Sequence, residues 1–256
     1  MKKNKIIFVS GSSKGIGKSI ARNLLKNDYS VIINGRNEEA LSKTFNEFSK
    51  ISNDKIFSIK GDMTKSDDIS IVKTFIDKKF GSINHLVCNI GSGKSKTGLD
   101  ESIEEFRNMF EINFFNAVML TKQLLPLIVS NESKNKSITF ISSIAGIEYL
   151  DCPISYSCAK SSLSVFSKAL SKTLGSDGIR VNTISPGNIL FEGSTWDQKI
   201  SKDKKLTNEY IKNNVPLNKF GSTSDVAQLV EYIISDKSSF LTGSNLVIDG
   251  GQNNSY

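Results

Sequence analysis

An apolar segment at residues 5–10 runs directly into a glycine-rich turn, and this junction constrains the fold more than any other feature of the sequence. The turn holds Gly11, Gly15 and Gly17 in the spacing G-x-x-x-G-x-G, and an amphipathic helix follows it. Glycines let the backbone turn tightly and approach a phosphate, while the amino end of the next helix offers free amides. The order strand, glycine turn, helix therefore predicts the opening of a nucleotide-binding βα unit.

The same turn also matches a different motif. Residues 11–15 read Gly-Ser-Ser-Lys-Gly, which fits the G-x-S-x-G elbow of α/β-hydrolases. A serine hydrolase needs a histidine late in the chain, after an acid. The chain has one histidine, His85, at the start of another expected strand. We therefore set the hydrolase interpretation aside and expect a structural role for His85.

Strand-like and helix-like patterns alternate along the whole chain, which predicts an α/β fold with right-handed βαβ crossovers and a parallel sheet. Further strands are expected at residues 31–34, 55–59, 85–89, 136–141, 178–184 and 245–249. A single helix is expected at about residues 102–129. The length of 256 residues suits one domain, residues 1–256, without repeats or linkers. The polar, lysine-rich stretch at about residues 188–215 is expected to be a mobile lid over a substrate.

A tyrosine and a lysine stand four positions apart at Tyr156 and Lys160, so a helix would present both on one face. A nearby ammonium favours the phenolate, lowers the pKa of the tyrosine from about 10 and makes it usable in proton transfer. Ser143 follows the strand at residues 136–141, at the sheet edge where such folds bind ligands. From these residues alone, a surface helix with a solvated lysine remains an alternative. For Asn113, in an apolar neighbourhood, a structural and a site role are equally compatible.

The end of the second expected strand indicates the cofactor. An acid there would hold the 2′-hydroxyl of NAD, but the sequence has none and offers Arg36, with Lys14 in the glycine turn. Two cations suit a 2′-phosphate, which favours NADP(H). Two solvated cations at loop tips are the alternative. Asp62 and Met63, after the third strand, are placed to border the adenine.

Charge and cysteine content exclude several classes of function. The net charge of +7 is spread along the chain without a basic run interleaved with aromatics, so we expect no nucleic-acid partner. Three cysteines without a Cys-x-x-Cys pair point to a reducing, cytoplasmic location, and one histidine makes a metal site improbable. The basic start, residues 1–5, precedes an apolar run of only residues 6–9, too short for a signal sequence or a membrane span.

Taken together and in this order, these motifs resemble the short-chain dehydrogenase/reductase family, and in particular its 3-oxoacyl-[acyl-carrier-protein] reductase-like members. The residues that carry the resemblance are the glycine turn, Asn89, Asn113, Ser143, Tyr156, Lys160 and Pro186-Gly187. The resemblance implies a single-domain Rossmann fold with a doubly wound parallel sheet of about seven strands, and a homotetramer or homodimer.

The resemblance also implies roles for individual residues. Tyr156 would protonate a carbonyl as hydride arrives, Lys160 would lower its pKa and hold the nicotinamide ribose, Ser143 would orient the substrate, and Asn113 would help to position a water. The implied cofactor-binding residues are Gly11, Ser13, Lys14, Gly15, Ile16, Gly17, Arg36, Asp62, Met63, Asn89, Gly91, Tyr156, Lys160, Pro186, Gly187 and Ile189.

Three departures from the family pattern concern the cofactor site. Ser10 replaces a threonine, Cys88-Asn89-Ile90-Gly91 replaces Asn-Asn-Ala-Gly, and Phe191 stands where a threonine is frequent. The implied function is an NADP(H)-dependent oxidoreductase of the type EC 1.1.1.-, acting on a small carbonyl or alcohol. The lysines at residues 188–215 favour a substrate that is acidic or carrier-bound, and a merely solvated lid is the alternative. A 3-oxoacyl thioester is the first candidate substrate, and a sugar or sugar nucleotide is the alternative. A nucleotide-sensing protein on the same fold is the non-enzyme alternative.

Overall fold

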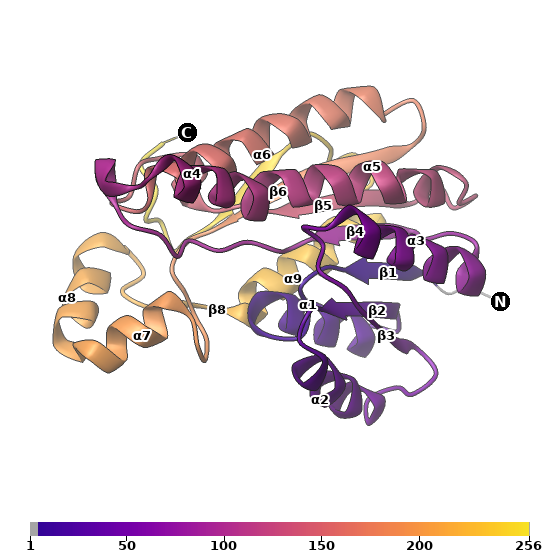
Figure 1. The fold of residues 1–256 in the computed structure, drawn as a ribbon, viewed down its shortest axis with the longest axis horizontal. Coiled ribbons are helices and arrows are strands. Elements are labelled where there is room, and N and C mark those ends of the chain that lie inside the picture. Colours follow the sequence, from indigo (N-terminus) through magenta and orange to yellow (C-terminus); the bar gives the residue numbers. More distant parts are fainter. Residues whose placement is uncertain (1–4, 256) are drawn as a thin grey trace.

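A computed structural model describes residues 5–255; residues 1–4, which belong to the basic start, and residue 256 lie outside the described part. Seven parallel strands form one sheet in the order β3-β2-β1-β4-β5-β6-β9 (Figure 1). The sheet strands are β1 (Ile6–Val9), β2 (Ser30–Gly35), β3 (Ile56–Lys60), β4 (His85–Cys88), β5 (Lys136–Ile141), β6 (Ile179–Pro186) and β9 (Asn245–Ile248). The α-helices outside residues 188–215 are α1 (Gly15–Lys26), α2 (Glu38–Ser49), α3 (Ser66–Phe80), α4 (Ile103–Phe110), α5 (Asn116–Val129), α6 (Ile154–Thr173) and α9 (Thr223–Ile234).

The sheet is doubly wound, because the strand order reverses between β1 and β4. Side chains of β1 alternate between two buried clusters: Ile7 and Val9 pack with α1, α2 and α9, whereas Phe8 packs with α3, α5 and α6. Helices thus cover both faces, and the crevice between the carboxyl ends of β1 and β4 is the place where such sheets bind ligands. The predicted α/β class and the seven-stranded Rossmann sheet are confirmed.

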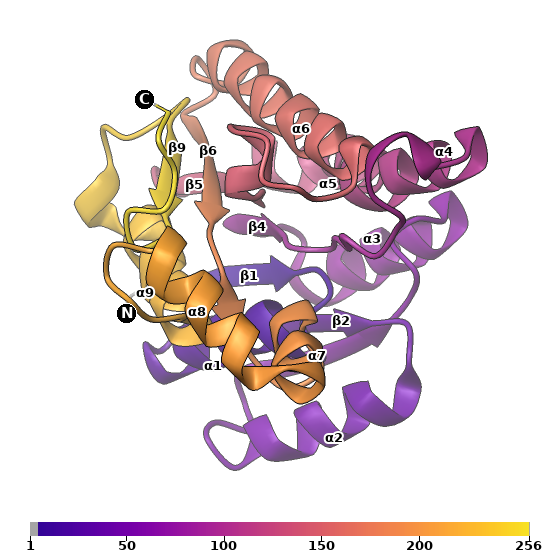
Figure 2. The same ribbon diagram turned by 90° about the vertical axis from the view of Figure 1, so that its left-hand side faces the viewer.

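The stretch at residues 188–215 leaves the carboxyl edge of the sheet. It contains the short strand β7 (Ile189–Leu190), which pairs with β8 (Gly221–Ser222), and the helices α7 (Thr195–Lys202) and α8 (Lys204–Asn214). Figure 2 shows α7 and α8 in front of this edge. Both helices begin at a side-chain cap, from Ser194 and Asp203 respectively, so this polar stretch is largely helical.

The helix expected at residues 102–129 is interrupted. The interruption is a π-helical turn, Glu111–Phe115, which separates α4 from α5 and carries the buried Asn113. Such turns are frequent at functional sites. By length and composition alone, Ile103–Val129 could also cross a membrane, with a mean hydropathy of 1.4. A core helix has the same composition, and the α5 side chains Leu120 and Leu124 are buried against the sheet.

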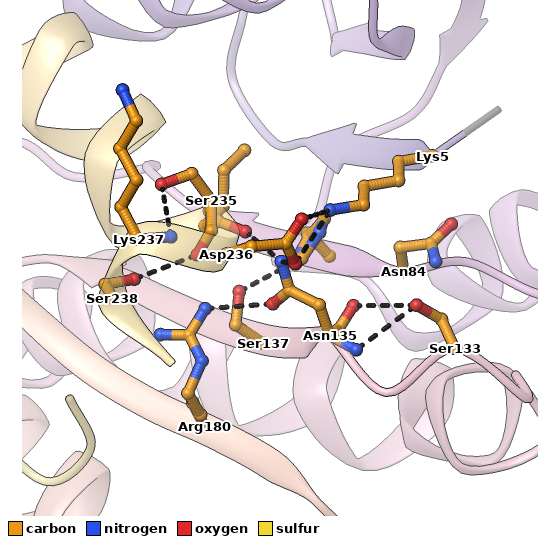
Figure 3. A network of polar contacts seen from close by, with 12 residues as sticks. Lys5, Asn84, Ser133, Asn135, Ser137, Arg180, Ser235, Asp236, Lys237 and Ser238 are labelled. Carbon is orange, nitrogen blue, oxygen red and sulfur yellow. Dashed lines mark hydrogen bonds and ion pairs between the residues drawn. The ribbon is translucent and has the colours of Figure 1, made fainter. Parts of the chain in front are cut away.

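A polar network lies at the opposite, amino edge of the sheet (Figure 3). Asp236 accepts hydrogen bonds from Lys5 and Asn135, and Asn135 accepts one from Arg180. His85 is buried beside this network, and its Nδ1 lies 2.8 Å from the Ser137 hydroxyl. The expectation that His85 is structural agrees with this position, because the edge is remote from the carboxyl ends of the strands.

Burial of His85, together with the nearby charges of Lys5 and Arg180, lowers its pKa from 6.5 to about 3. The unfolded chain therefore binds a proton on His85 between about pH 6.5 and pH 3, whereas the folded chain does not. Stability must fall as the pH falls through this window, by about 2 kcal/mol at pH 5. We expect the free energy of unfolding, measured with urea at pH 7 and at pH 5, to fall less between these two values in His85→Gln than in the wild type, by the amount that His85 contributes. Equal losses in the wild type and the variant would contradict the assignment.

Candidate functional site

Two adjoining clefts open at the carboxyl edge of the sheet. The first, of about 500 Å³, is lined by the glycine turn and by the residues that follow β2, β3 and β4. The second, of about 430 Å³, is lined by the residues that follow β5 and β6, by the start of α6 and by α7. Ile16, Gly93, Phe191, Ser194 and Thr195 line both clefts, so a molecule in the first cleft borders the second.

The glycine turn has the geometry of an anion site. Gly11 and Gly15 adopt φ of +60° and +57°, and a Cβ on Gly17 would lie 2.5 Å from the Gly11 carbonyl oxygen. Asn89, after β4, donates to the carbonyls of Ser10 and Gly11 at 3.2 and 3.1 Å and thus fixes the turn. Helix α1 begins without a side-chain cap or an acid in its first turn. Its first amides are therefore available to a phosphate, which fits the diphosphate of a dinucleotide.

The far end of the first cleft carries charge of both signs. Lys14 and Arg36 line it, and neither of the two residues directly after β2, Arg36 and Asn37, is an acid. The Arg36 side chain is 79% exposed, and its Nη1 lies 3.8 Å from Oδ2 of Asp62. Burial raises the pKa of Asp62, but hydrogen bonds from Thr64 and the charge of Arg36 outweigh it and hold the pKa below its ordinary value. Two cations and one carboxylate thus meet at this end.

Two of the expected catalytic side chains, Tyr156 and Ser143, lie on the wall of the second cleft, and a third, Lys160, lies behind it. The Ser143 hydroxyl is close enough to the Tyr156 hydroxyl to act on it and lower its pKa. Lys160 is buried, and its Nζ donates to the Ile141 carbonyl at 3.0 Å. The Ser142 hydroxyl instead donates to the Lys160 carbonyl at 3.0 Å. Of the two neighbouring serines, Ser143 is therefore the one that faces Tyr156.

The expected lowering of the Tyr156 pKa is not found. Burial raises the pKa of Tyr156 above its ordinary value, and the neighbouring Ser143 hydroxyl opposes this rise without reversing it. Burial also lowers the pKa of Lys160 to about 8. The Lys160 Nζ lies 5.9 Å from the centre of the Tyr156 ring and binds a backbone carbonyl, so helical spacing alone does not pair the two groups. The tyrosine is thus held in its protonated form.

Asn113 connects the π-helical turn to the loop after β4. Its Oδ1 accepts from the Ser92 amide, and its Nδ2 donates to the carbonyls of Ser92 and Met109, at 2.9, 2.9 and 3.0 Å. A Cβ on Gly91 would lie 2.9 Å from Asn113 Oδ1 and 2.8 Å from Lys160 Nζ. Asn113 therefore lies next to Lys160, while its side chain fixes the turn at Gly91–Gly93.

All the predicted site residues except Gly17, Asn113 and Lys160 line at least one of the two clefts. In the first cleft these are Gly11, Ser13, Lys14, Gly15, Ile16, Arg36, Asp62, Met63, Asn89 and Gly91; in the second, Ile16, Ser143, Tyr156, Pro186, Gly187 and Ile189. Among the departures, the Phe191 ring covers the glycine turn, because a Cβ on Gly15 would lie 2.7 Å from it.

The outer wall of the second cleft was not predicted from the sequence. Trp196 packs against Tyr210 at 5.2 Å between ring centres and against Phe220 at 5.5 Å. Gln252 is buried, donates to the Tyr210 hydroxyl at 3.2 Å and accepts from Asn188 at 2.7 Å. Its position just after β9, at the carboxyl edge, is the signal that could have identified Gln252.

The Lys199 ammonium lies 4.5 Å above the Trp196 ring and lines the same cleft. Among residues 5–255, no group of three or more His, Cys, Asp or Glu side chains could hold a metal ion. The side chains that line the clefts supply hydroxyls, amides and cations, together with the carboxylates of Asp62 and Asp151.

Known proteins resemble this chain over nearly its full length. A family model described as Enoyl-(Acyl carrier protein) reductase matches residues 11–253. The 3-oxoacyl-[acyl-carrier-protein] reductase FabG of Chlamydia muridarum is 32% identical over 250 residues, which cover 97% of each chain.

Solved structures also superpose on nearly the whole chain. L-sorbose reductase from Gluconobacter frateurii, complexed with NADPH and L-sorbose, superposes with a TM-score of 0.92 at 24% identity, covering 99% of this chain and 98% of that one. A 7α-hydroxysteroid dehydrogenase complexed with NADH and 7-oxo glycochenodeoxycholic acid gives a TM-score of 0.88 at 26% identity, with 97% and 94% covered.

Proposed function

The chain belongs to the short-chain dehydrogenase/reductase family of oxidoreductases, and from this membership we propose that it uses NADP(H) to interconvert a carbonyl and an alcohol. The observation that carries the proposal is the placement of Tyr156 beside Ser143 on the wall of the second cleft, next to Gly93, which lines both clefts. A protein that only sensed a nucleotide would have no use for a buried, protonated phenol and a lysine of lowered pKa beside that cleft.

The first cleft fits the cofactor through the free amides of α1, the close approach allowed at Gly11 and Gly15, and the cations Lys14 and Arg36. When bound, NADP(H) supplies or accepts the hydride. The cations favour NADP(H) through charge-assisted contacts to a 2′-phosphate. Asn89 holds the glycine turn at the required distance from β4.

The remaining steps belong to the side chains. Ser143 holds the substrate oxygen, and the Tyr156 hydroxyl donates its proton to that oxygen as negative charge develops on it. The raised pKa of Tyr156 keeps this proton available for reduction at neutral pH. Behind Tyr156, Lys160 and a water that Asn113 would help to position would replace the proton that Tyr156 gives up; both residues lie at the turn of Gly91. In the oxidation direction the phenolate accepts the proton instead.

The substrate is proposed to be a carbonyl compound with an acidic or carrier-bound group, and a 3-oxoacyl thioester is the first candidate. The support is the relation to FabG and the lysines of the stretch at residues 188–215, of which Lys199 lines the second cleft. A sugar-like substrate is favoured by a different observation: Trp196, Tyr210 and Gln252 form an aromatic wall with amide groups.

A panel of carbonyl compounds tests the substrate. We expect NADPH oxidation with a 3-oxoacyl thioester and with a keto-sugar nucleotide to exceed that with a neutral ketone, and the excess to shrink at high salt because charge attraction is screened. Lys199→Gln should reduce the excess, whereas Lys43→Gln, on α2 and outside both clefts, should not. A neutral ketone that reacts fastest at every salt concentration would contradict an acidic substrate. Turnover of no carbonyl would refute the proposed function.

Further parts of the proposal concern assembly and location. Ile103, Phe115, Val165 and Phe240 are large apolar side chains that are exposed on the single chain. They support a homotetramer or homodimer, which sedimentation of the purified protein would test.

We also propose one cytoplasmic domain over residues 1–256, in which the stretch at residues 188–215 closes over the substrate.

A further inference from the structure

The helix that carries Tyr156 and Lys160 begins without a cap of its own. Pro153 occupies the N-cap position of α6 and makes no side-chain hydrogen bond to the helix. The first amides of an α-helix have no acceptor within the helix. Tyr156 is the third residue of α6, so it lies in this first turn, where helices fray most easily. Something outside α6 must therefore hold the turn that carries the proposed proton donor.

Glu101 supplies the missing acceptor. Its Oε2 accepts from the Ser155 amide at 3.0 Å, and its Oε1 accepts from the Ser155 hydroxyl. Ser155 is fully buried, and only 9% of Glu101 is exposed. Burial raises the pKa of Glu101, but the hydrogen bonds from Ser155 outweigh this effect and keep the pKa below its ordinary value. A charged carboxylate thus lies at the positive end of the α6 dipole, where it is most favourable.

The backbone around Glu101 is itself well held. Glu101 lies between the short 3₁₀ helix Gly98–Asp100 and α4, whose start is a capping box between Ser102 and Glu105. Helices α4 and α6 pack side by side (Figures 1 and 2). The loop between β4 and α4 thus reaches over the site and contacts α6 at its first turn.

We propose that Glu101 is a positioning residue: its carboxylate caps α6 from the neighbouring loop and holds Tyr156 in register with Ser143. The effect on turnover rests on the proposed function, because it requires Tyr156 to be the proton donor. The cap that Glu101 forms on α6 does not depend on that function. A shift of about 1 Å in a reacting group can reduce a rate roughly hundredfold, so a cap one residue from Tyr156 can control turnover without touching the substrate.

Two variants and one control test the proposal. Glu101→Ala removes both hydrogen bonds, and Glu101→Gln keeps one acceptor without the charge. Glu104→Ala removes an exposed carboxylate on α4 whose ion pair is with Arg107, within the same helix. We expect amide exchange of Ser155 and Tyr156 to be roughly 2- to 30-fold faster in Glu101→Ala, intermediate in Glu101→Gln and unchanged in Glu104→Ala and in α1. Should Glu101→Ala fail to fold, Ser155→Ala removes the hydroxyl contact alone and should show a smaller increase.

Turnover separates positioning from plain stability. We expect kcat of Glu101→Ala to fall by roughly 10- to 100-fold while KM for NADPH stays within about twofold, with partial rescue in Glu101→Gln. Unchanged amide exchange at Ser155 and Tyr156 would refute the cap. Faster exchange with an unchanged kcat would refute the positioning role. If the wild type reduces no carbonyl, the proposed function fails, whereas the exchange result still decides whether Glu101 holds Tyr156.

Discussion

Tyr156→Phe is expected to remove nearly all carbonyl reduction while NADPH still binds. The substitution deletes only the hydroxyl, which lies beside Ser143 on the wall of the second cleft. A positioned acid typically contributes about 10²- to 10⁴-fold to the rate, so kcat should fall by that factor. The first cleft should be unaffected, because its binding groups come from the ends of β1 to β4. Steady-state kinetics and NADPH fluorescence titration measure the two quantities.

A matched control separates loss of the acid from loss of any tyrosine hydroxyl. Tyr149 lies seven residues earlier, is 58% exposed and lines neither cleft. Tyr149→Phe should therefore retain wild-type turnover. If Tyr156→Phe keeps more than about a tenth of the wild-type rate, another group donates the proton.

The sequence predicted those parts of the fold that depend on local pattern. The glycine turn after β1 requires positive φ at Gly11 and Gly15, which only glycine adopts without strain, so its position could be read directly. Alternating apolar stretches gave the sheet strands to within two residues at each end. The break at Glu111–Phe115 was missed because its residues continue the helical pattern. A π-helical turn differs from an α-helix in which backbone groups are hydrogen-bonded, and here the Asn113 side chain also donates to the Met109 carbonyl.

Contacts between distant segments were less predictable. The spacing of Tyr156 and Lys160 is correct for one helical face, but burial and a carbonyl of β5 decide where the Lys160 ammonium points. Gln252 and Trp196 both line the second cleft although 56 positions (252 − 196) separate them in the sequence, and no local pattern predicts that they are neighbours. Glu101 likewise caps a helix 54 positions away in sequence.

NADPH should be preferred over NADH, and Arg36→Asp should weaken or reverse that preference. The Arg36 side chain lines the first cleft and is 79% exposed, so it is free to reach a 2′-phosphate. The competing carboxylate of Asp62 is 3.8 Å away and already accepts hydrogen bonds from the Thr64 amide and hydroxyl. Loss of a charge-assisted contact costs about 1.5–3 kcal/mol, so affinity for NADPH should fall roughly 10- to 150-fold.

The effect on NADH distinguishes a specific contact from general electrostatics. An aspartate at position 36 can accept from a ribose 2′-hydroxyl, so NADH binding should be unchanged or tighter in Arg36→Asp. Lys14→Gln should also lower the affinity for NADPH, because Lys14 lines the same cleft as Arg36. Arg107→Asp alters the net charge equally, but on α4 and outside both clefts, so it should leave the ratio of the two affinities unchanged. Equal affinity of the wild type for NADPH and NADH would show that Lys14 and Arg36 are solvated cations without a role in cofactor choice.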